Sequence, residues 1–232
     1  MSLPVARPGI PILRIALRIA IIAAVVAAVV VVAMTSQRGV WWRLITFTYQ
    51  ANLLAAGRLA SSREARGKGV LVVMNGAAHD ARHLIKARTS GLDAFESAEA
   101  WSAARADGRF ADLDVMNLPR VDILPGYAGA PARLIDACVA DGARGLVLAL
   151  AGHGSVPASW LPGLRLAQDQ GVAILRASRC AGPVTRNANA DDDGEGWLTA
   201  GDLPPPKARI ALMLALASRF SATETQALLL RP

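Results

Sequence analysis

Residues 79–89 bring together the side-chain types that could do chemistry in this chain. His79 and His83 are four residues apart, the spacing of a zinc-binding pair on one face of a helix. No third ligand and no glutamate accompanies them, so the sequence predicts no metal site. Lys86 and Thr89 follow closely. A lysine can activate a hydroxyl nucleophile, but most lysines in polar segments are solvated surface charges.

A glycine loop follows the apolar stretch GLVLALA. Gly152 and Gly154 fit part of a dinucleotide fingerprint, but Pro157 occupies the third glycine position. We therefore expect no nucleotide and no other cofactor. His153 within the loop could be a ligand or a base, although an ordinary turn residue is the simpler interpretation. The acidic run Asp191–Asp193 is predicted to be a solvated loop, even though such runs can bind cations.

The elements from Pro119 onward alternate between strands and helices. The pattern predicts three parallel strands with right-handed crossovers, hence an α/β fold. A helix with Ile210, Met213, Leu214 and Ala217 on one face should follow Pro204–Pro206, and Ser221 with Glu224 predicts a capping box for a final helix. The predicted strands are 121–124, 145–151 and 172–175. The first connecting helix is predicted from about Pro131 to Asp141, and the second from about Ser155 to Gln170.

Residues 51–118 are less regular. Ala51–Ser61 is predicted to be a short helix, and the Val-rich run Gly69–Met74 to be a buried parallel strand. Asn75–Asp80 is expected to be a loop and Ala81–Phe95 to be extended. Residues 99–118 are polar and irregular, which indicates a linker.

The first fifty residues differ from the rest. The formal net charge is +7, yet residues 1–50 hold five Arg and no acidic residue, so the basic surplus is mostly N-terminal. No basic stripe interleaved with aromatics follows, and we expect no nucleic-acid binding.

The uncharged run Ile19–Met34 follows Arg7, Arg14 and Arg18 and predicts an apolar helix. Three interpretations stay open: a membrane or signal anchor, a cleavable signal peptide, or sequence that is not native. Membrane contact through residues 19–34 and a membrane-anchored or periplasmic location follow from the first two, and a cytoplasmic location from the third.

Four stretches of the chain together carry a resemblance. The first is GKGVLVVMN with ARHLIKARTSGLDAFES, and the second is LPRVDIL with Tyr127. The third is GLVLALAGHGSVP with VAILRASRC, and the fourth is GWLTAGDLPPPKARIALMLALA. In this order they resemble bacterial-type L-asparaginase. They cover about residues 51–229, and none falls within residues 1–50. The resemblance implies hydrolysis of asparagine, and often of glutamine, to the acid and ammonia, in a protein that forms homodimers and homotetramers.

The resemblance also implies which residues perform the reaction. The family uses a threonine from a TGGT-type loop, a second threonine beside an aspartate in a TDT-type segment, and a lysine. Lys86 matches that lysine and is the predicted catalytic residue. The sequence contains no Gly-Gly pair and no Thr-Asp-Thr, and Thr89 matches neither threonine.

We therefore expect an N-terminally truncated or frame-disrupted family member that is inactive alone. It should comprise the apolar segment 1–50, a remnant of the family's N-terminal domain at 51–118, and its C-terminal α/β domain at 119–232. The alternative is a membrane-anchored, non-catalytic domain that binds an amino acid or a partner chain.

Overall fold

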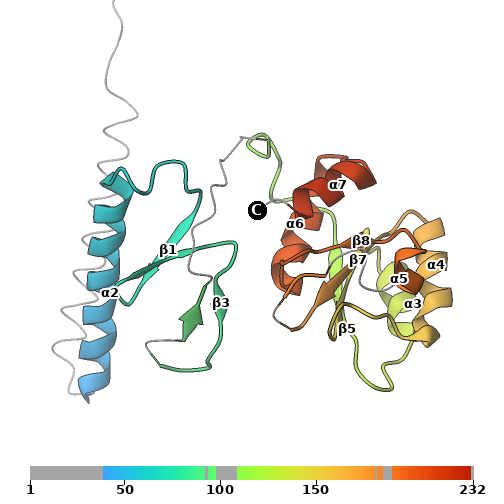
Figure 1. Ribbon diagram of the computed structural model, residues 1–232, viewed down its shortest axis with the longest axis horizontal. Coiled ribbons are helices and arrows are strands. Elements are labelled where there is room, and N and C mark those ends of the chain that lie inside the picture. The colour runs from blue at the N-terminus through green and yellow to red at the C-terminus, as the bar shows by residue number, and fades with distance from the viewer. Residues whose placement is uncertain (1–38, 92–93, 98–108, 181, 185–189, 231–232) are drawn as a thin grey trace, which may run out of the picture.

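The computed structural model describes residues 39–91, 94–97, 109–180, 182–184 and 190–230 of the chain. A helix with two hairpins forms the N-terminal part, and a four-stranded sheet with helices on both faces forms the C-terminal part (Figure 1). The α/β prediction is confirmed. The predicted apolar helix at 19–34 lies outside the described residues. Among the helices that are described, none combines the length and the apolarity that a membrane span requires.

The C-terminal sheet is parallel and follows chain order, β5-β6-β7-β8. Its strands are β5 Val121–Pro125, β6 Gly145–Leu150, β7 Ala173–Ser178 and β8 Leu198–Thr199. The sequence predicted the first three. It missed β8, because two residues carry too little periodicity to indicate a strand.

Two pairs of helices cover the two faces of this sheet. Helices α3 Arg133–Ala140 and α4 Leu161–Asp169 lie on one face, the second preceded by a 3-10 turn, η1 Ala158–Trp160. Helices α6 Pro205–Ala217 and α7 Ala222–Leu229 lie on the other. Strand β6 is buried on both faces: Leu146, Leu148 and Leu150 pack towards α3 and α4, and Val147 towards α6. This accounts for its uninterrupted apolar sequence.

Two predictions concern the last two helices, and their outcomes differ. The capping box is confirmed, since Ser221 Oγ accepts from the Glu224 N–H and the Glu224 carboxylate accepts from the Ser221 N–H. The apolar face predicted for α6 matches the packed side only in part: Ala208, Leu212 and Ala215 are buried, Met213 packs against the core, and Ile210 is exposed. Because α6 is apolar nearly all round, its sequence does not specify which face is inside.

In the N-terminal part, helix α2 runs from Gly39 to Ser61, well beyond the predicted helix. The predicted parallel strand is instead β1 Leu71–Met74 of an antiparallel hairpin with β2 Ala77–Asp80, and the predicted loop contains β2. Asn75 and Gly76, with φ of 50° and 76°, form its turn. Two residues with positive φ match the twist of a hairpin, and Asn-Gly is the usual sequence for that turn.

A second hairpin pairs β3 Ile85–Lys86 with β4 Phe95–Glu96. Part of the predicted linker, residues 99–108, lies outside the described residues. Residues 109–117 are mostly turns. The short helix α5 Ala190–Asp193 precedes β8.

Candidate functional site

Lys86, the predicted catalytic residue, lies in strand β3. Its register partner in β4 is Phe95, and its ammonium nitrogen is 5.8 Å from the centre of the Phe95 ring. The side chain is exposed. Within the described residues, no hydrogen bond or ion pair joins this ammonium group to a threonine or an aspartate, and Thr89 is also exposed. Among the described residues, the structure therefore brings no hydroxyl nucleophile to Lys86.

Lys207 attaches the turn that precedes β3 to the C-terminal domain. Lys207 of α6 donates hydrogen bonds from Nζ to the carbonyl oxygens of Ala81, Arg82 and Leu84, at 2.8, 2.6 and 2.6 Å. Burial lowers the pKa of the Lys207 ammonium, the sign of a partly desolvated cation. Leu84 directly precedes Ile85 and Lys86, so Lys207 fixes the start of the strand that carries Lys86.

A second contact lies beside the first. Asp202 accepts from Arg82 Nη2 at 2.7 Å, and its other oxygen is 2.9 Å from His83 Nε2. Burial raises the pKa of the Asp202 carboxyl, but the hydrogen bonds from Arg82 and His83 outweigh it and hold that pKa below its usual range. We call Arg82, His83, Asp202 and Lys207 the polar joint.

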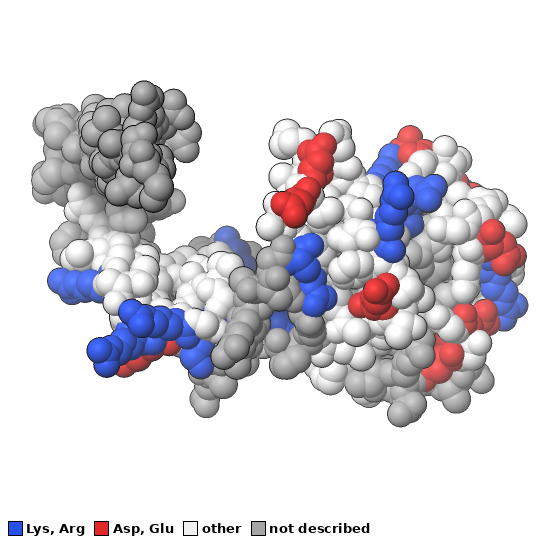
Figure 2. All heavy atoms as spheres, turned by 90° about the horizontal axis from the view of Figure 1, so that it is seen from above, with Lys and Arg blue, Asp and Glu red and all other residues white. Residues whose placement is uncertain are grey.

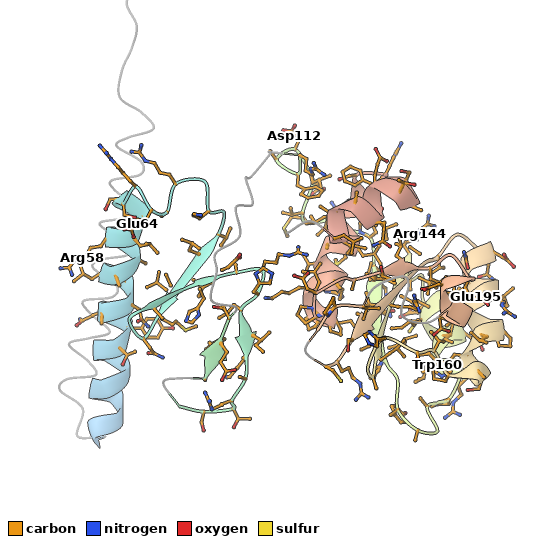
Figure 3. All side chains as sticks on the ribbon, in the orientation of Figure 1. Arg58, Glu64, Asp112, Arg144, Trp160 and Glu195 are labelled. Carbon is orange, nitrogen blue, oxygen red and sulfur yellow. The ribbon has the colours of Figure 1, made fainter. Side chains whose placement is uncertain are left out.

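A hollow of about 360 Å³ lies at the carboxyl ends of β5 and β6. In open parallel sheets this end is where ligands bind. Its polar side chains are Tyr127, Ser155, Ser159 and Arg179, and several glycine and alanine residues complete it. Trp160 stabilises the wall of the hollow, because its fully buried indole donates to the Ala130 carbonyl at 3.0 Å (Figure 3). The sequence motifs singled out none of the four polar side chains as site residues.

Comparison with known proteins decides the family. The model of the asparaginase N-terminal domain matches residues 18–116, and that of the glutaminase/asparaginase C-terminal domain matches residues 120–229. The chain belongs to the bacterial-type L-asparaginase family. The N-terminal match extends into residues 1–50, further than the four resembling stretches predicted.

Individual relatives agree with this family assignment. A glutaminase-asparaginase from Pseudomonas fluorescens is 35% identical over 193 residues, 75% of this chain and 53% of the relative. L-asparaginase 2 from Bacillus subtilis is 34% identical over 76% of this chain and 51% of its own length. The crystal structure of a probable cytoplasmic L-asparaginase from Campylobacter jejuni superposes with a TM-score of 0.69 at 28% identity, over 78% of this chain and 65% of that one. This asparaginase-family chain spans about half the length of the curated relatives it matches.

The histidines of this asparaginase-family chain have separate structural roles. His79 lies in β2, with Nδ1 2.9 Å from Ser97 Oγ, whereas His83 belongs to the polar joint. His153 is exposed in the glycine loop. In the part of the chain that the structure describes, no group of three His, Cys, Asp or Glu side chains is placed to hold a metal ion.

The sequence predicted a solvated loop at the acidic run Asp191–Asp193, and this prediction is wrong. Arg176 of β7 is fully buried and forms ion pairs with Asp192, at 3.6 Å, and with Asp193. Asp192 is itself buried and accepts from the Val156 N–H at 3.1 Å. A buried guanidinium requires carboxylates nearby, so α5 is held over the end of β7. In the sequence, the one indication of this ion pair was an arginine within an otherwise apolar strand.

Proposed function

We propose that this chain, although it belongs to the asparaginase family, does not hydrolyse asparagine or glutamine by itself. The observation that carries the proposal is the surroundings of Lys86: an exposed ammonium beside an aromatic ring, with no hydroxyl hydrogen-bonded to it among the described residues. Amide hydrolysis of this type needs an activated hydroxyl nucleophile and donors for the oxyanion. The sequence has neither the TGGT-type nor the TDT-type segment that would supply the threonines.

Ammonia release tests the proposal directly. The purified full chain is incubated with L-asparagine or L-glutamine, with the Pseudomonas fluorescens relative as positive control. We expect a rate equal to that of the buffer. A Lys86→Ala variant is the matched control, because contaminating amidase activity would be the same in both preparations. Turnover near the rate of the relative that disappears in Lys86→Ala would contradict the proposal.

A second candidate function is the binding of a free amino acid, asparagine or glutamine, in the hollow at the carboxyl ends of β5 and β6. Arg179 supports it, because a guanidinium pairs well with a carboxylate, and three hydroxyl groups line the same hollow. Titration calorimetry with L-asparagine should give heat that Arg179→Ala abolishes. Arg144→Ala is the control, since this exposed arginine precedes β6 at the opposite end of the strand. Equal heats from both variants would rule this candidate out.

The membrane-anchored alternative depends on the run Ile19–Met34 and the three arginines before it. Fractionation of cells that express the full chain tests it: an anchored protein stays in the membrane pellet after a carbonate wash. A soluble product that begins near residue 51 would contradict this alternative.

Self-association is the remaining part of the proposal. By likeness to the family we propose a homodimer or homotetramer, with contacts through the C-terminal domain. Light scattering on the purified chain measures the mass directly. A single mass near 24.3 kDa over the accessible concentration range would exclude the oligomer.

A further inference from the structure

His83 lies between two carboxylates that belong to the two parts of the chain. Its Nε2 is 2.9 Å from Oδ2 of Asp202, in the C-terminal domain, and its Nδ1 is 3.4 Å from Oδ2 of Asp80, at the end of β2. The Asp80 side chain is 5% exposed and that of Asp202 is 40% exposed. One imidazole ring of the polar joint therefore contacts a buried carboxylate on one side and a partly exposed carboxylate on the other.

The two cations of the polar joint have other hydrogen-bond partners. An ammonium group has three N–H bonds, and the three hydrogen bonds from Lys207 to carbonyl oxygens of the turn use them all. Arg82 Nη2 donates to Oδ1 of Asp202 at 2.7 Å and to the Leu229 carbonyl at 3.0 Å. Figure 2 shows Lys and Arg interspersed with Asp and Glu over the C-terminal domain, so no field of one sign dominates the face drawn there. The local contacts of His83 therefore decide how its charge affects the joint.

The charge of His83 determines how many carboxylates it can pair with. A neutral imidazole has one N–H, so in either tautomer the other nitrogen presents a lone pair to a carboxylate, which is repulsive. The charged ring has two N–H groups and faces a carboxylate with each of them. Within the described residues, Nδ1 is buried and forms no hydrogen bond, so the contact with Asp80 is the one that protonation adds. Histidine side chains change between these two forms between about pH 5 and 8.

We propose that His83 makes the attachment between the two parts of the chain pH-dependent. Below about pH 6 the charged ring links Asp80 of the N-terminal part to Asp202 of the C-terminal domain, and the polar joint is closed. As the pH rises to about 8, the ring loses one N–H and the joint opens more often. Leu84 directly precedes the strand that carries Lys86, so the attachment of this strand to the C-terminal domain depends on pH as well. The proposal holds whether or not the chain hydrolyses amides.

Amide hydrogen exchange of the full chain at about pH 5.5 and about pH 8 measures this opening. The amides of His83 and Leu84, both bonded to the Asp80 carbonyl, are compared with amides of β6, and each rate is corrected for the pH dependence of exchange in an unfolded peptide. An ion pair of this exposure changes an opening equilibrium by up to about five-fold. We expect the turn to open about two- to five-fold more often at the higher pH, and β6 to be unchanged.

Substitution of each histidine identifies the group responsible. His83→Gln keeps an N–H donor for Asp202 but does not change charge, so the pH dependence at the turn should disappear. His79→Gln and His153→Gln remove the other two histidines of the chain and should leave that dependence intact. Asp202 stays ionised over this range, because its pKa is lowered from 3.8, whereas burial lowers the pKa of Lys207 from 10.5 towards the range. A pH dependence that survives in His83→Gln belongs to another group, such as Lys207, and contradicts the proposal.

A second measurement does not depend on the folding of a His83 variant. The imidazole NMR signal of His83 is assigned in the wild-type chain, because His79→Gln and His153→Gln each remove one of the other two signals. This signal should titrate with the same midpoint as the exchange at the turn. Different midpoints, equal opening at both pH values, or a turn that opens less often at the higher pH would each overturn the proposal.

Discussion

Replacing Lys207 by methionine tests whether the polar joint attaches the two parts of the chain. The substitution keeps the apolar stem of the side chain and removes three charge-assisted hydrogen bonds, to the carbonyl oxygens of Ala81, Arg82 and Leu84. Hydrogen bonds to charged groups contribute about 1.5–3 kcal/mol each. The ammonium is only partly buried and its charge is costly to desolvate, which offsets part of the gain. We expect a net loss of about 2–4 kcal/mol at the turn.

Amide hydrogen exchange locates this loss. A local opening that becomes easier by 2–4 kcal/mol exchanges about 30- to 1,000-fold faster. The amides of His83 and Leu84, both bonded to the Asp80 carbonyl, should show the change, and amides of β6 should not. Lys86→Met is the control, because this exposed lysine contacts only the Phe95 ring among the described residues. Unchanged exchange at the turn in Lys207→Met would refute the reasoning.

Three further substitutions test the joint and the core. Because the pKa of Asp202 is lowered in the folded protein, the ionised carboxylate stabilises the fold at pH above the usual pKa of 3.8, and this stabilisation is lost as the pH falls through the lowered pKa. Asp202→Asn should abolish this acid sensitivity of amide exchange at the turn. Arg176→Met removes the cation that pairs with Asp192 and Asp193, of which Asp192 is buried, and should lower the free energy of unfolding in urea by about 3–5 kcal/mol. Gly145→Ala places a Cβ 2.9 Å from Leu212 and should lower it by about 1–3 kcal/mol, whereas a midpoint equal to wild type would show that α6 moves freely.

The C-terminal domain was largely predictable because its own sequence determines it. Val121–Leu124 is mostly apolar and Gly145–Ala151 is entirely so, both are bounded by turn residues, and the connecting helices have an apolar side. Both signals arise from contacts within the domain, so a local pattern is enough. The exceptions were the two-residue strand β8, the short helix α5, and the orientation of α6, whose uniformly apolar sequence fits several rotations about its axis.

The N-terminal part was predicted less well, for physical reasons. The run Gly69–Met74 has the composition of a buried parallel strand, yet its residues 71–74 form one strand of a hairpin and are only half-buried. The composition of a strand indicates how much burial its side chains can tolerate, but it does not indicate which strand pairs with it. The Asn-Gly dipeptide at 75–76 was the informative signal, and it was treated as an ordinary loop.

The candidate site was the least predictable feature. Lys86 follows from likeness to the family, and its role stays a prediction. Arg179 and the hydroxyls of the hollow come from segments far apart in the sequence, and only the sheet brings them together. The ion pair of the buried Arg176 with the partly buried Asp193 joins β7 to α5 in the same way, across 17 residues. No spacing rule within one element predicts such contacts.

The chain-order arrangement of the C-terminal sheet has a consequence for folding. Each strand pairs with the strand that follows it, so every crossover closes a short loop. The conformational entropy lost in closing each loop is offset by the contacts of that strand pair before the next strand is added. A nascent chain can therefore add strands in the order in which they leave the ribosome. Helix α6, made near the end, contacts the earlier strands β5, β6 and β7, whereas α7 packs on α6 and β8, and the arrival of these two helices completes the second core.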